Sequence, residues 1–440
     1  MENYVIIGVI VLLILIFYVS GRIATRQKNA ALRAKLIRDF GILPEQTYQA
    51  SDFERIRKYY DKKKTAGDPA ETFHIDDMTW NDLNMNDIFA LFNATQSSVG
   101  EEYLYERMHR MELKETKRFA SLTDYFQTHE QERVNAQISL HGLSKITHFS
   151  VTDILDRIAG LERERNLKHF VLDVLLLLSI ALIFFYPGPG ILLAIIFLAY
   201  SVISYFGRKG EIEPFYTTFF YVVRLLRCAD EILSMSDEVA GEDKEDLIRI
   251  ANTCRPFRRN AYFLASGVHL TENIFEIILD YIRIIFHIDI IKFNSMLEFL
   301  QEHTEEIDTL REALGQIDAA IGVANAMKAI PGLTRPGFWE NKELSVTDAF
   351  HPLLKKPVSN SITTKGGVLI TGSNASGKST FIKTVALCAL LAQTLYVVPA
   401  ASYRSCRVRL CTSMALADRI KENESYFIVE IKSLKRIADL

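Results

Sequence analysis

Three long apolar segments stand out in the pattern of hydrophobic and polar positions along the chain. Residues 4–20 carry no charged side chain over about the thickness of a bilayer. Residues 169–186 and 191–206 form a second and a third apolar run, separated only by Pro-Gly-Pro-Gly at 187–190. Basic residues follow the first run and flank both ends of the pair. By the positive-inside rule, this pattern predicts a multi-pass membrane protein with three spans, its N-terminus outside and the rest of the chain cytoplasmic.

Two alternatives to membrane spans must be considered for these segments. A cleaved signal peptide at 1–20 fits poorly, because no positive charge precedes the apolar run and no small-x-small cleavage site follows it. The pair at 169–206 could instead be a buried helical hairpin in a soluble core. Its nearly unbroken apolar composition, without a period of 3.6 residues, favours a membrane hairpin in contact with the lipid bilayer.

The rest of the pattern is mostly helical. Residues 21–68 are polar and predict a solvated cytoplasmic linker helix. Residues 69–168 and 207–340 place apolar positions at helical spacing and predict a helical core that the hairpin divides. Within the second part, charges interrupt 274–300 at close intervals, so we expect one long amphipathic packing helix there. Turns and short strand-like runs begin at 331, which predicts a domain boundary near 340 and a final domain at 341–440.

Composition narrows the classes of protein to which the chain can belong. The net charge is −3 with 24% charged residues, so the chain as a whole is not a basic nucleic-acid-binding surface. The five cysteines are scattered and form no Cys-x-x-Cys pair, which supports neither a disulfide framework nor a zinc site. Reduced thiols fit a cytoplasmic compartment.

One motif carries specific chemistry, the pattern Gly-x-x-x-x-Gly-Lys-Ser of a P-loop. It follows the apolar run 368–370, an expected strand, and precedes an expected helix at 381–395. Backbone N–H groups of such a loop and the positive end of the helix face a phosphate. The lysine reaches the outer phosphates, and the serine hydroxyl can ligate Mg²⁺. The predicted ATP-binding residues are Gly372, Ser373, Asn374, Ala375, Ser376, Gly377, Lys378, Ser379 and Thr380, with Ser379 also the Mg²⁺ ligand.

The residues around this loop resemble the ATPase of the MutS family of mismatch-repair proteins. The loop matches at Thr371, Gly372, Asn374 and 377–380, and the Tyr-Val-Pro-Ala run of the family is similar to residues 396–400. Ser373, Ala375 and Ser376 depart from the family, which has Pro, Met and Gly there. The resemblance also implies nucleotide contacts for His351, in a His-Pro pair, and for Val358, near the position of the adenine-stacking aromatic residue of the family.

The resemblance extends downstream and upstream of the loop. Ser425, Phe427 and Glu430 match a signature that, in the family, completes the nucleotide site of the partner subunit, which implies a homodimer. Residues 75–108 resemble the start of the helical core of the family. Residues 314–328 resemble its lever helix, with Asp318 as the marker. The fold implied is an incomplete α/β P-loop NTPase domain, preceded by an all-α lever core with transmembrane helices.

The function implied is that of a membrane-tethered MutS-like ATP-binding protein with ATP-dependent binding of mismatched or structured DNA. DNA is expected from the resemblance alone, since no mismatch-reading domain is recognisable. Hydrolysis needs carboxylates that hold Mg²⁺ and orient water. The chain reaches Leu440 before any Walker B segment, so we expect a fragment of a longer ATPase that binds ATP weakly or not at all and does not hydrolyse it.

Two other classes remain open. An ABC-type membrane transporter ATPase would share the P-loop and the spans, but the chain has no Leu-Ser-Gly-Gly-Gln signature. A membrane-bound NTP-driven scaffold without DNA binding is the second of these classes. It would differ from a MutS-like protein in showing no salt-dependent binding to DNA.

Overall fold

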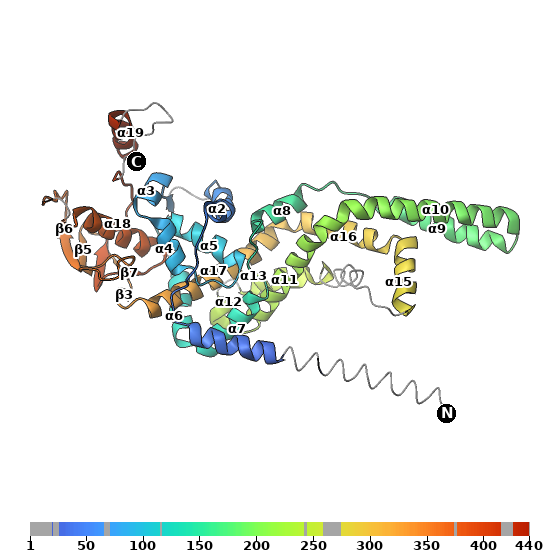
Figure 1. Ribbon diagram of the computed structural model, residues 1–440, viewed down its shortest axis with the longest axis horizontal. Helices are drawn as coiled ribbons and strands as arrows, with labels where there is room; N and C mark the ends of the chain where they lie inside the picture. The colour runs from blue at the N-terminus through green and yellow to red at the C-terminus, as the bar shows by residue number, and fades with distance from the viewer. Residues whose placement is uncertain are drawn as a thin grey trace. The chain divides into compact units, whose positions relative to one another are not determined.

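The computed structural model divides the chain into two compact units (Figure 1). Unit 1 consists of residues 1–145 and 315–440, and unit 2 of residues 146–314. The structure describes residues 20, 26–65, 71–114, 117–241, 244–257, 274–373, 376–414 and 426–439. The predicted anchor at 4–20 lies outside the described residues apart from Ser20. Unit 1 is discontinuous in sequence, so the first part of the predicted core folds together with the predicted ATPase segment.

Helix α5 is a fully buried helix of unit 1 that contacts α2, α4 and α18. All twelve residues of α5 are buried, and α2 packs against it through Arg55, Ile56, Tyr59 and Tyr60. The prediction of a solvated linker is therefore wrong for α2, because its tyrosine and isoleucine face is covered. The helical elements are a helix over 26–39, α2 (Ala50–Lys64), α3 (Asp77–Asp82), α4 (Met85–Phe92), α5 (Ser98–His109), α6 (Arg118–Thr128), α7 (Glu130–His141), α17 (Thr304–Ala329, which enters unit 1 at Gly315), α18 (Lys378–Thr394) and α19 (Tyr426–Ala438).

Short strands complete unit 1. The strands are β1 (Thr72–His74), β2 (Arg110–Glu112), β3 (Leu333–Thr334), β4 (Gly337–Phe338), β5 (Leu344–Ala349), β6 (Asn360–Thr364), β7 (Val398–Pro399) and β8 (Ser402–Ser405). A four-stranded sheet has the order β4-β8-β5-β6, and two antiparallel pairs join β1 to β2 and β3 to β7. Helix α18 packs on this sheet through a buried apolar cluster that includes Val346, Cys388, Ala392 and Tyr403. Strand structure thus begins at Leu333, before the predicted boundary near 340.

The predicted strand in front of the P-loop is not formed. Residues 367–373 have no strand structure, and Val368 and Leu369 are 52% and 88% exposed. A strand needs a hydrogen-bonding neighbour, and in the part of the chain that is described none pairs with this run. The observed sheet is also largely antiparallel, with β4–β8 as its parallel pair. The parallel P-loop sheet predicted from the sequence is therefore not seen in the described residues.

Unit 2 is helical where it is described. Its helices are α8 (Val151–Ala159), α9 (Leu167–Ile183), α10 (Pro187–Ile212), the 3-10 turn η1 (Glu213–Phe215), α11 (Tyr216–Leu233), α12 (Asp237–Ala240), α13 (Lys244–Thr253), α15 (Ile274–Ile285) and α16 (Ile288–Glu302). The single packing helix predicted at 274–300 is instead two helices. The break falls at His287, whose backbone adopts the left-handed conformation with a φ of 47° and therefore ends a regular helix.

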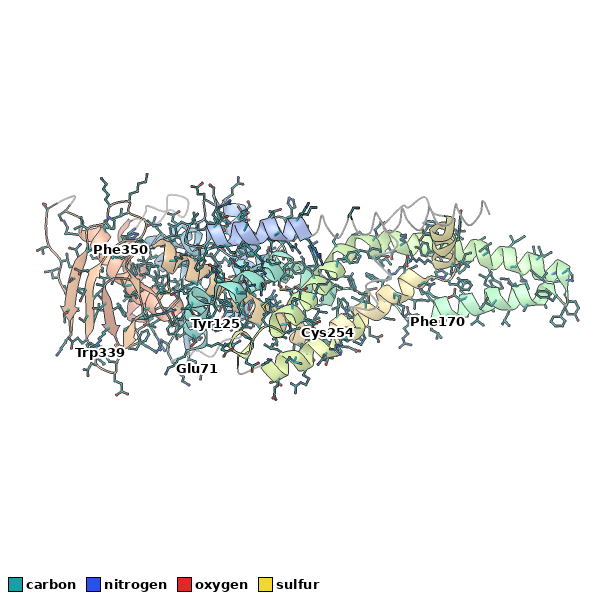
Figure 2. All side chains as sticks on the ribbon, turned by 90° about the horizontal axis from the view of Figure 1, so that it is seen from below. Glu71, Tyr125, Phe170, Cys254, Trp339 and Phe350 are labelled. Atoms are coloured by element: carbon teal, nitrogen blue, oxygen red, sulfur yellow. The ribbon has the colours of Figure 1, made fainter. Side chains whose placement is uncertain are left out.

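The two apolar arms do form a helical hairpin, with α9 packed along α10. Helix α10 already begins at Pro187, a residue favoured in the first turn of a helix, so the turn lies at 184–186 rather than at 187–190. A Cβ at Gly190 would lie 2.6 Å from the backbone nitrogen of Ile183, so the close approach of the arms requires glycine there. Exposed apolar side chains line the hairpin, among them Phe170, which Figure 2 labels.

One helical segment of the described chain, Pro187–Leu233, is long and apolar enough to cross a membrane by length and composition. Only 17% of its most apolar stretch is buried, so most of the surface of that stretch is not covered by protein. This exposed apolar surface is compatible with the predicted membrane hairpin. That the hairpin crosses a membrane stays a prediction.

Candidate nucleotide-binding site

The candidate site is built around the first turn of α18. Gly377 precedes this helix with a φ of +87°, a left-handed conformation in which a side chain would be strained. It turns the chain from the loop into the helix, so the free N–H groups of the first turn, with the positive end of the helix dipole, are available to an anion. The predicted helix after the P-loop is therefore present and starts at Lys378.

Lys378 is folded back over its own loop. Its ammonium group donates hydrogen bonds to the carbonyl oxygens of Gly372, at 2.7 Å, and Ser373, at 2.6 Å. A Cβ on Gly372 would lie 3.0 Å from the hydroxyl oxygen of Ser376, so this glycine lets the loop close tightly. The lysine is therefore held beside the helix N-terminus, where a phosphate could take over from the carbonyls as its partner.

A pocket of about 530 Å³ opens at this turn and unites residues that are distant in sequence. Among the predicted site residues, it is lined by His351, Val358, Ser376, Gly377, Lys378 and Thr380. The segment between β5 and β6 supplies His351 and Val358, and β6 adds Asn360 to the lining. The rest of the lining was not predicted from the sequence and consists of Ala349, Leu354, Lys356, Ile370, Thr371, Phe381 and Thr384.

The electrostatics of this pocket favour an anion. Lys356 and Lys378 both line it, and none of its described lining residues is a carboxylate. His351 is largely buried, and burial, with a smaller effect of Lys383, lowers the pKa of its imidazole. The imidazole is therefore neutral near pH 7, and its buried Nδ1 has no hydrogen-bond partner among the described residues. Lys356 could have been recognised in the sequence from the Lys-Lys-Pro-Val segment that contains Val358.

Several predicted residues are not brought into this pocket. Gly372, Ser373 and Ser379 do not line it, and Ser379 is exposed. Asn374, Ala375 and Ser425 lie outside the described residues. Phe427 and Glu430 belong to α19, although their side chains are not described. Across the described ranges no three His, Cys, Asp or Glu side chains are grouped as metal ligands. The described lining therefore suits a polyphosphate but does not provide a ligand set for Mg²⁺.

A buried polar network lies in the helical core and joins residues from the ranges 75–108 and 314–328, which resemble the core and the lever helix of the family. The Asp318 carboxylate of α17 accepts hydrogen bonds from the backbone N–H groups of Gln96 and Ser97, and from the Ser97 hydroxyl at 2.6 Å. Complete burial outweighs these bonds and raises the pKa of Asp318 to about 6. Helix α17 is thus fixed to the start of α5 by a fully buried carboxylate.

The far end of α18 joins the same core. The Arg107 side chain of α5 donates a hydrogen bond to the Thr394 carbonyl oxygen at 2.8 Å and pairs with Glu112. Gln393 accepts from the Val408 N–H at 2.8 Å. Helix α18, which begins at the candidate pocket, therefore ends in contact with α5, and the start of α5 in turn contacts Asp318.

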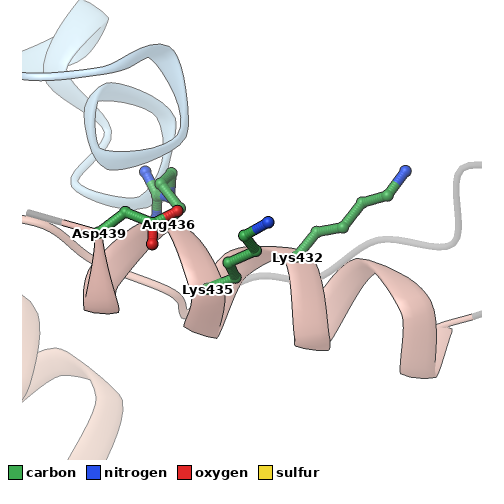
Figure 3. Close-up of a pocket in the computed structure, with 4 residues that line it drawn as sticks. All are labelled: Lys432, Lys435, Arg436 and Asp439. Atoms are coloured by element: carbon green, nitrogen blue, oxygen red, sulfur yellow. The ribbon is translucent and has the colours of Figure 1, made fainter.

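A second surface feature lies on α19. Figure 3 shows Lys432, Lys435, Arg436 and Asp439 around a shallow pocket on this helix. The Arg436 guanidinium is occupied, because it pairs with Asp76 at the start of α3 and donates to the Thr412 carbonyl. Arg436 thus attaches α19 to the start of α3.

The fold and the pocket define a mostly helical protein with a C-terminal sheet-and-helix segment that carries a Gly-Lys-Ser loop at a helix N-terminus. Residues 368–439, which contain this loop, match MutS domain V. "MutS protein homolog 4" of Homo sapiens is 29% identical over 252 residues, which cover 54% of this chain and 25% of that protein. "DNA mismatch repair protein MutS" of Leptospira interrogans is 30% identical over 178 residues, 38% of this chain and 21% of that protein.

The bacterial protein "DNA mismatch repair protein MutS" of Pseudothermotoga lettingae is 32% identical over 136 residues, which cover 29% of this chain and 17% of that protein. Together with the domain match, these relatives support membership of the chain in the MutS family. The chain spans a quarter or less of the length of these curated relatives.

Proposed function

We propose that this chain is a MutS-like nucleotide-binding protein whose pocket holds the phosphates of ATP. The observation that carries the proposal is the pocket of about 530 Å³ in which His351 and Val358 meet the loop residues Gly377 and Lys378. Lys356 and Lys378 supply positive charge, and the α18 N-terminus supplies N–H donors. Val358 is 80% exposed and offers an apolar contact to the base. Ser379 stays a predicted ligand of Mg²⁺.

Saturation-transfer NMR with ATP tests this proposal, because it detects weak ligands. We expect binding near the millimolar range, roughly −4 kcal/mol. Lys378→Ala removes the phosphate contact and should abolish the signal. Lys365→Ala is the matched control, since Lys365 is exposed, pairs with Glu343 and does not line the pocket. Equal ATP signals from the Lys378→Ala and Lys365→Ala variants would contradict the proposal.

Turnover is expected to need groups that this pocket does not contain. The described lining has two lysines and a neutral histidine but no carboxylate to orient water. We propose that a second copy contributes Ser425, Phe427 and Glu430 to the site, as the family resemblance implies. These residues are not the carboxylates that hold Mg²⁺ and orient water, so we propose that the chain does not hydrolyse ATP even as a homodimer. Phosphate release by the purified chain that disappears in Lys378→Ala would overturn this part.

We propose ATP-dependent binding of mismatched or structured DNA as the role of the whole protein. Its support is the mismatch-repair name that several relatives carry. With a net charge of −3, the chain as a whole is not a basic surface, so any contacts to DNA would be local. Titration of mismatched, branched and fully paired duplexes at two salt concentrations tests it. Absence of binding with ATP, with ADP and without nucleotide would favour a membrane-bound NTP-driven scaffold.

We also propose that the α9–α10 hairpin tethers the protein to a lipid bilayer. The support is its exposed apolar surface, with Leu178 60%, Ile195 60% and Ile203 71% exposed. A variant that lacks residues 4–20 should still sediment with vesicles. Adding Leu178→Lys and Ile195→Lys to that variant should release it, because charged side chains are costly in the hydrocarbon core. Sedimentation that persists in the doubly charged variant would contradict insertion of the hairpin.

A further inference from the structure

A second lysine, Lys356, lines the candidate nucleotide pocket from the connection between β5 and β6. Its side chain is exposed, and it forms no ion pair with any residue that the structure describes. Lys378 supplies the other ammonium group of the pocket, from the first turn of α18. No carboxylate among the described lining residues neutralises either lysine. The pocket therefore carries two uncompensated positive charges that come from separate elements.

The N-terminus of α18 indicates where a phosphate chain would lie. Gly377, Lys378 and Thr380 line the pocket at the first turn of this helix, whose free N–H groups face an anion. A nucleotide anchored there extends to the rest of the lining, which includes Lys356. Because a triphosphate carries more negative charge than a monophosphate, it gains more from the presence of both ammonium groups.

The groups that could read the edge of a base are engaged or out of reach. The Asn360 side-chain amide donates to the Val358 carbonyl oxygen at 3.1 Å, and the Thr384 hydroxyl donates to the Thr380 carbonyl oxygen at 2.7 Å. Asn360 is also exposed, so water satisfies its remaining polar atoms whichever base is bound. The Nδ1 atom of His351 is buried, so a ligand in the pocket does not reach it. Strong discrimination needs fixed polar groups that the wrong ligand leaves unpaired, and these three side chains do not impose that penalty.

The apolar part of the lining favours no particular base. Val358 and Leu354 are 80% and 47% exposed, so they offer a loose contact whose strength depends on the area covered. Phe381 lines the pocket from α18, and stacking on an aromatic ring tolerates any base because every base has a π-face. These contacts add affinity for a base without selecting one.

We propose that this pocket selects its ligand by the phosphate chain and not by the base, with Lys356 as a second phosphate contact beside Lys378. The ligand class is the nucleoside triphosphates as a group, of which ATP is one member. This inference rests on the proposed function, because it requires that the pocket holds the phosphates of a nucleotide. It adds a binding residue and a selectivity that the Gly-Lys-Ser loop by itself does not specify.

Competition against the ATP signal in saturation-transfer NMR tests the selectivity, with the full chain in detergent. GTP, CTP and UTP should each displace ATP with an affinity within about threefold of that of ATP, a difference of about 0.7 kcal/mol at most. Inorganic tripolyphosphate should also displace ATP, because it carries the phosphate chain without a base. AMP should bind at least about tenfold more weakly, which corresponds to about 1.4 kcal/mol.

Lys356→Ala tests the added residue. Lys355→Ala is the matched control, because Lys355 is the exposed neighbour of Lys356 and does not line the pocket. Lys356→Ala should weaken the binding of ATP and of tripolyphosphate alike by about fivefold, about 1 kcal/mol, and Lys355→Ala should leave both unchanged. Since the lost contact is between exposed charges, the difference between the two variants should shrink when the salt concentration is raised from about 0.05 M to about 0.3 M.

Failure of this inference differs from failure of the proposed function. An ATP signal that depends on Lys378 but is not displaced by UTP or by tripolyphosphate overturns the lack of base selectivity. Equal ATP affinities in Lys356→Ala and Lys355→Ala overturn the role of Lys356. Absence of any ATP signal that depends on Lys378 overturns the proposed function, and this inference falls with it.

Discussion

At the scale of single residues, the tightest constraint in the helical core is the approach of Asp318 to Gly100. A Cβ built on Gly100 would lie 2.3 Å from the Asp318 carboxylate oxygen and 2.5 Å from its Cβ. Asp318 cannot retreat, because it accepts hydrogen bonds from Gln96 and Ser97 in a fully buried position. Glycine at position 100 is therefore a packing requirement, and it explains why the sequence pairs a glycine in α5 with an aspartate in α17.

Gly100→Ala should destabilise unit 1 by about 3 kcal/mol, because the extra methyl group forces the buried carboxylate away from its donors. The measurement is the midpoint of urea denaturation followed by tryptophan fluorescence. Gly366→Ala is the control, since a Cβ there meets nothing within 4 Å, and it should change the midpoint little. A Gly100→Ala midpoint equal to that of the control would show that the α5–α17 contact is looser than described.

His109 predicts a pH dependence. Its ring is fully buried between Trp80 and Tyr60, with centroids 3.6 Å and 4.2 Å away, and burial lowers its pKa from 6.5 to about 3. The unfolded chain therefore binds a proton that the folded chain does not, and stability falls as the pH drops below 6.5. Between pH 6.5 and about pH 5 the loss from this residue is about 2 kcal/mol.

The difference in unfolding free energy between the parent chain and His109→Gln isolates this term. His74, whose pKa burial lowers to about 4, acts in the same direction. Asp318 acts in the opposite direction, because its raised pKa makes its contribution disappear as the pH rises through about 6. His74 and Asp318 are present in both the parent and the variant, so their contributions cancel in the difference of the two unfolding free energies. The difference should shrink toward acid, and a difference that is constant from pH 7 to pH 5 would contradict the assignment.

At the scale of elements, α3 holds the segment that follows β8. Asp82 of α3 accepts hydrogen bonds from the Thr412 hydroxyl at 2.7 Å and from the Met414 N–H at 2.8 Å. Thr79 accepts one from the Thr412 N–H at 3.1 Å. Thr79 lies in the range 75–108, which resembles the start of the helical core of the family, and the structure gives it the physical role of a docking contact for the C-terminal segment.

Asp82→Ala should release this segment. Without the carboxylate, the Met414 amide loses its acceptor, so we expect its hydrogen exchange to accelerate by about tenfold, for a bond worth roughly 1.5 kcal/mol to a charged acceptor. Asp87→Ala on α4 is the control, because Asp87 is exposed. Unchanged exchange at Met414 in Asp82→Ala would mean that the segment is held by other contacts.

Much of the element pattern could be predicted from the sequence, where local signals decide. The Gly-Lys-Ser loop predicts a helix that does start at Lys378, and two apolar runs around Pro187 predict the hairpin. The predictions that fail are those whose outcome depends on contacts with residues distant in the sequence. The run at 368–370 has strand composition but no neighbouring strand, and α2 looks solvated although α5 covers it. The pocket could be predicted at Lys378, and Lys356 could have been inferred from its position two residues before Val358, but Leu354 and Thr384 line the pocket with no signal in the sequence.

At the scale of the whole molecule, the division into units makes a local probe available. Both tryptophans of the chain, Trp80 and Trp339, belong to unit 1, whereas helices in both units contribute to far-ultraviolet circular dichroism. Unit 2 has its own buried core, which includes Leu226 on α11, 1% exposed. Leu226→Ala leaves a cavity and should cost about 3 kcal/mol in that core.

We therefore expect the two units to unfold separately, in one detergent-solubilised sample. Leu226→Ala should shift part of the dichroism transition to lower urea while the fluorescence transition stays in place. Gly100→Ala should do the reverse, moving the fluorescence transition and leaving the unit 2 part of the dichroism unchanged. Coincident shifts of both signals in either variant would show that the units unfold as a single cooperative structure, because two-state unfolding gives the same midpoint with every probe.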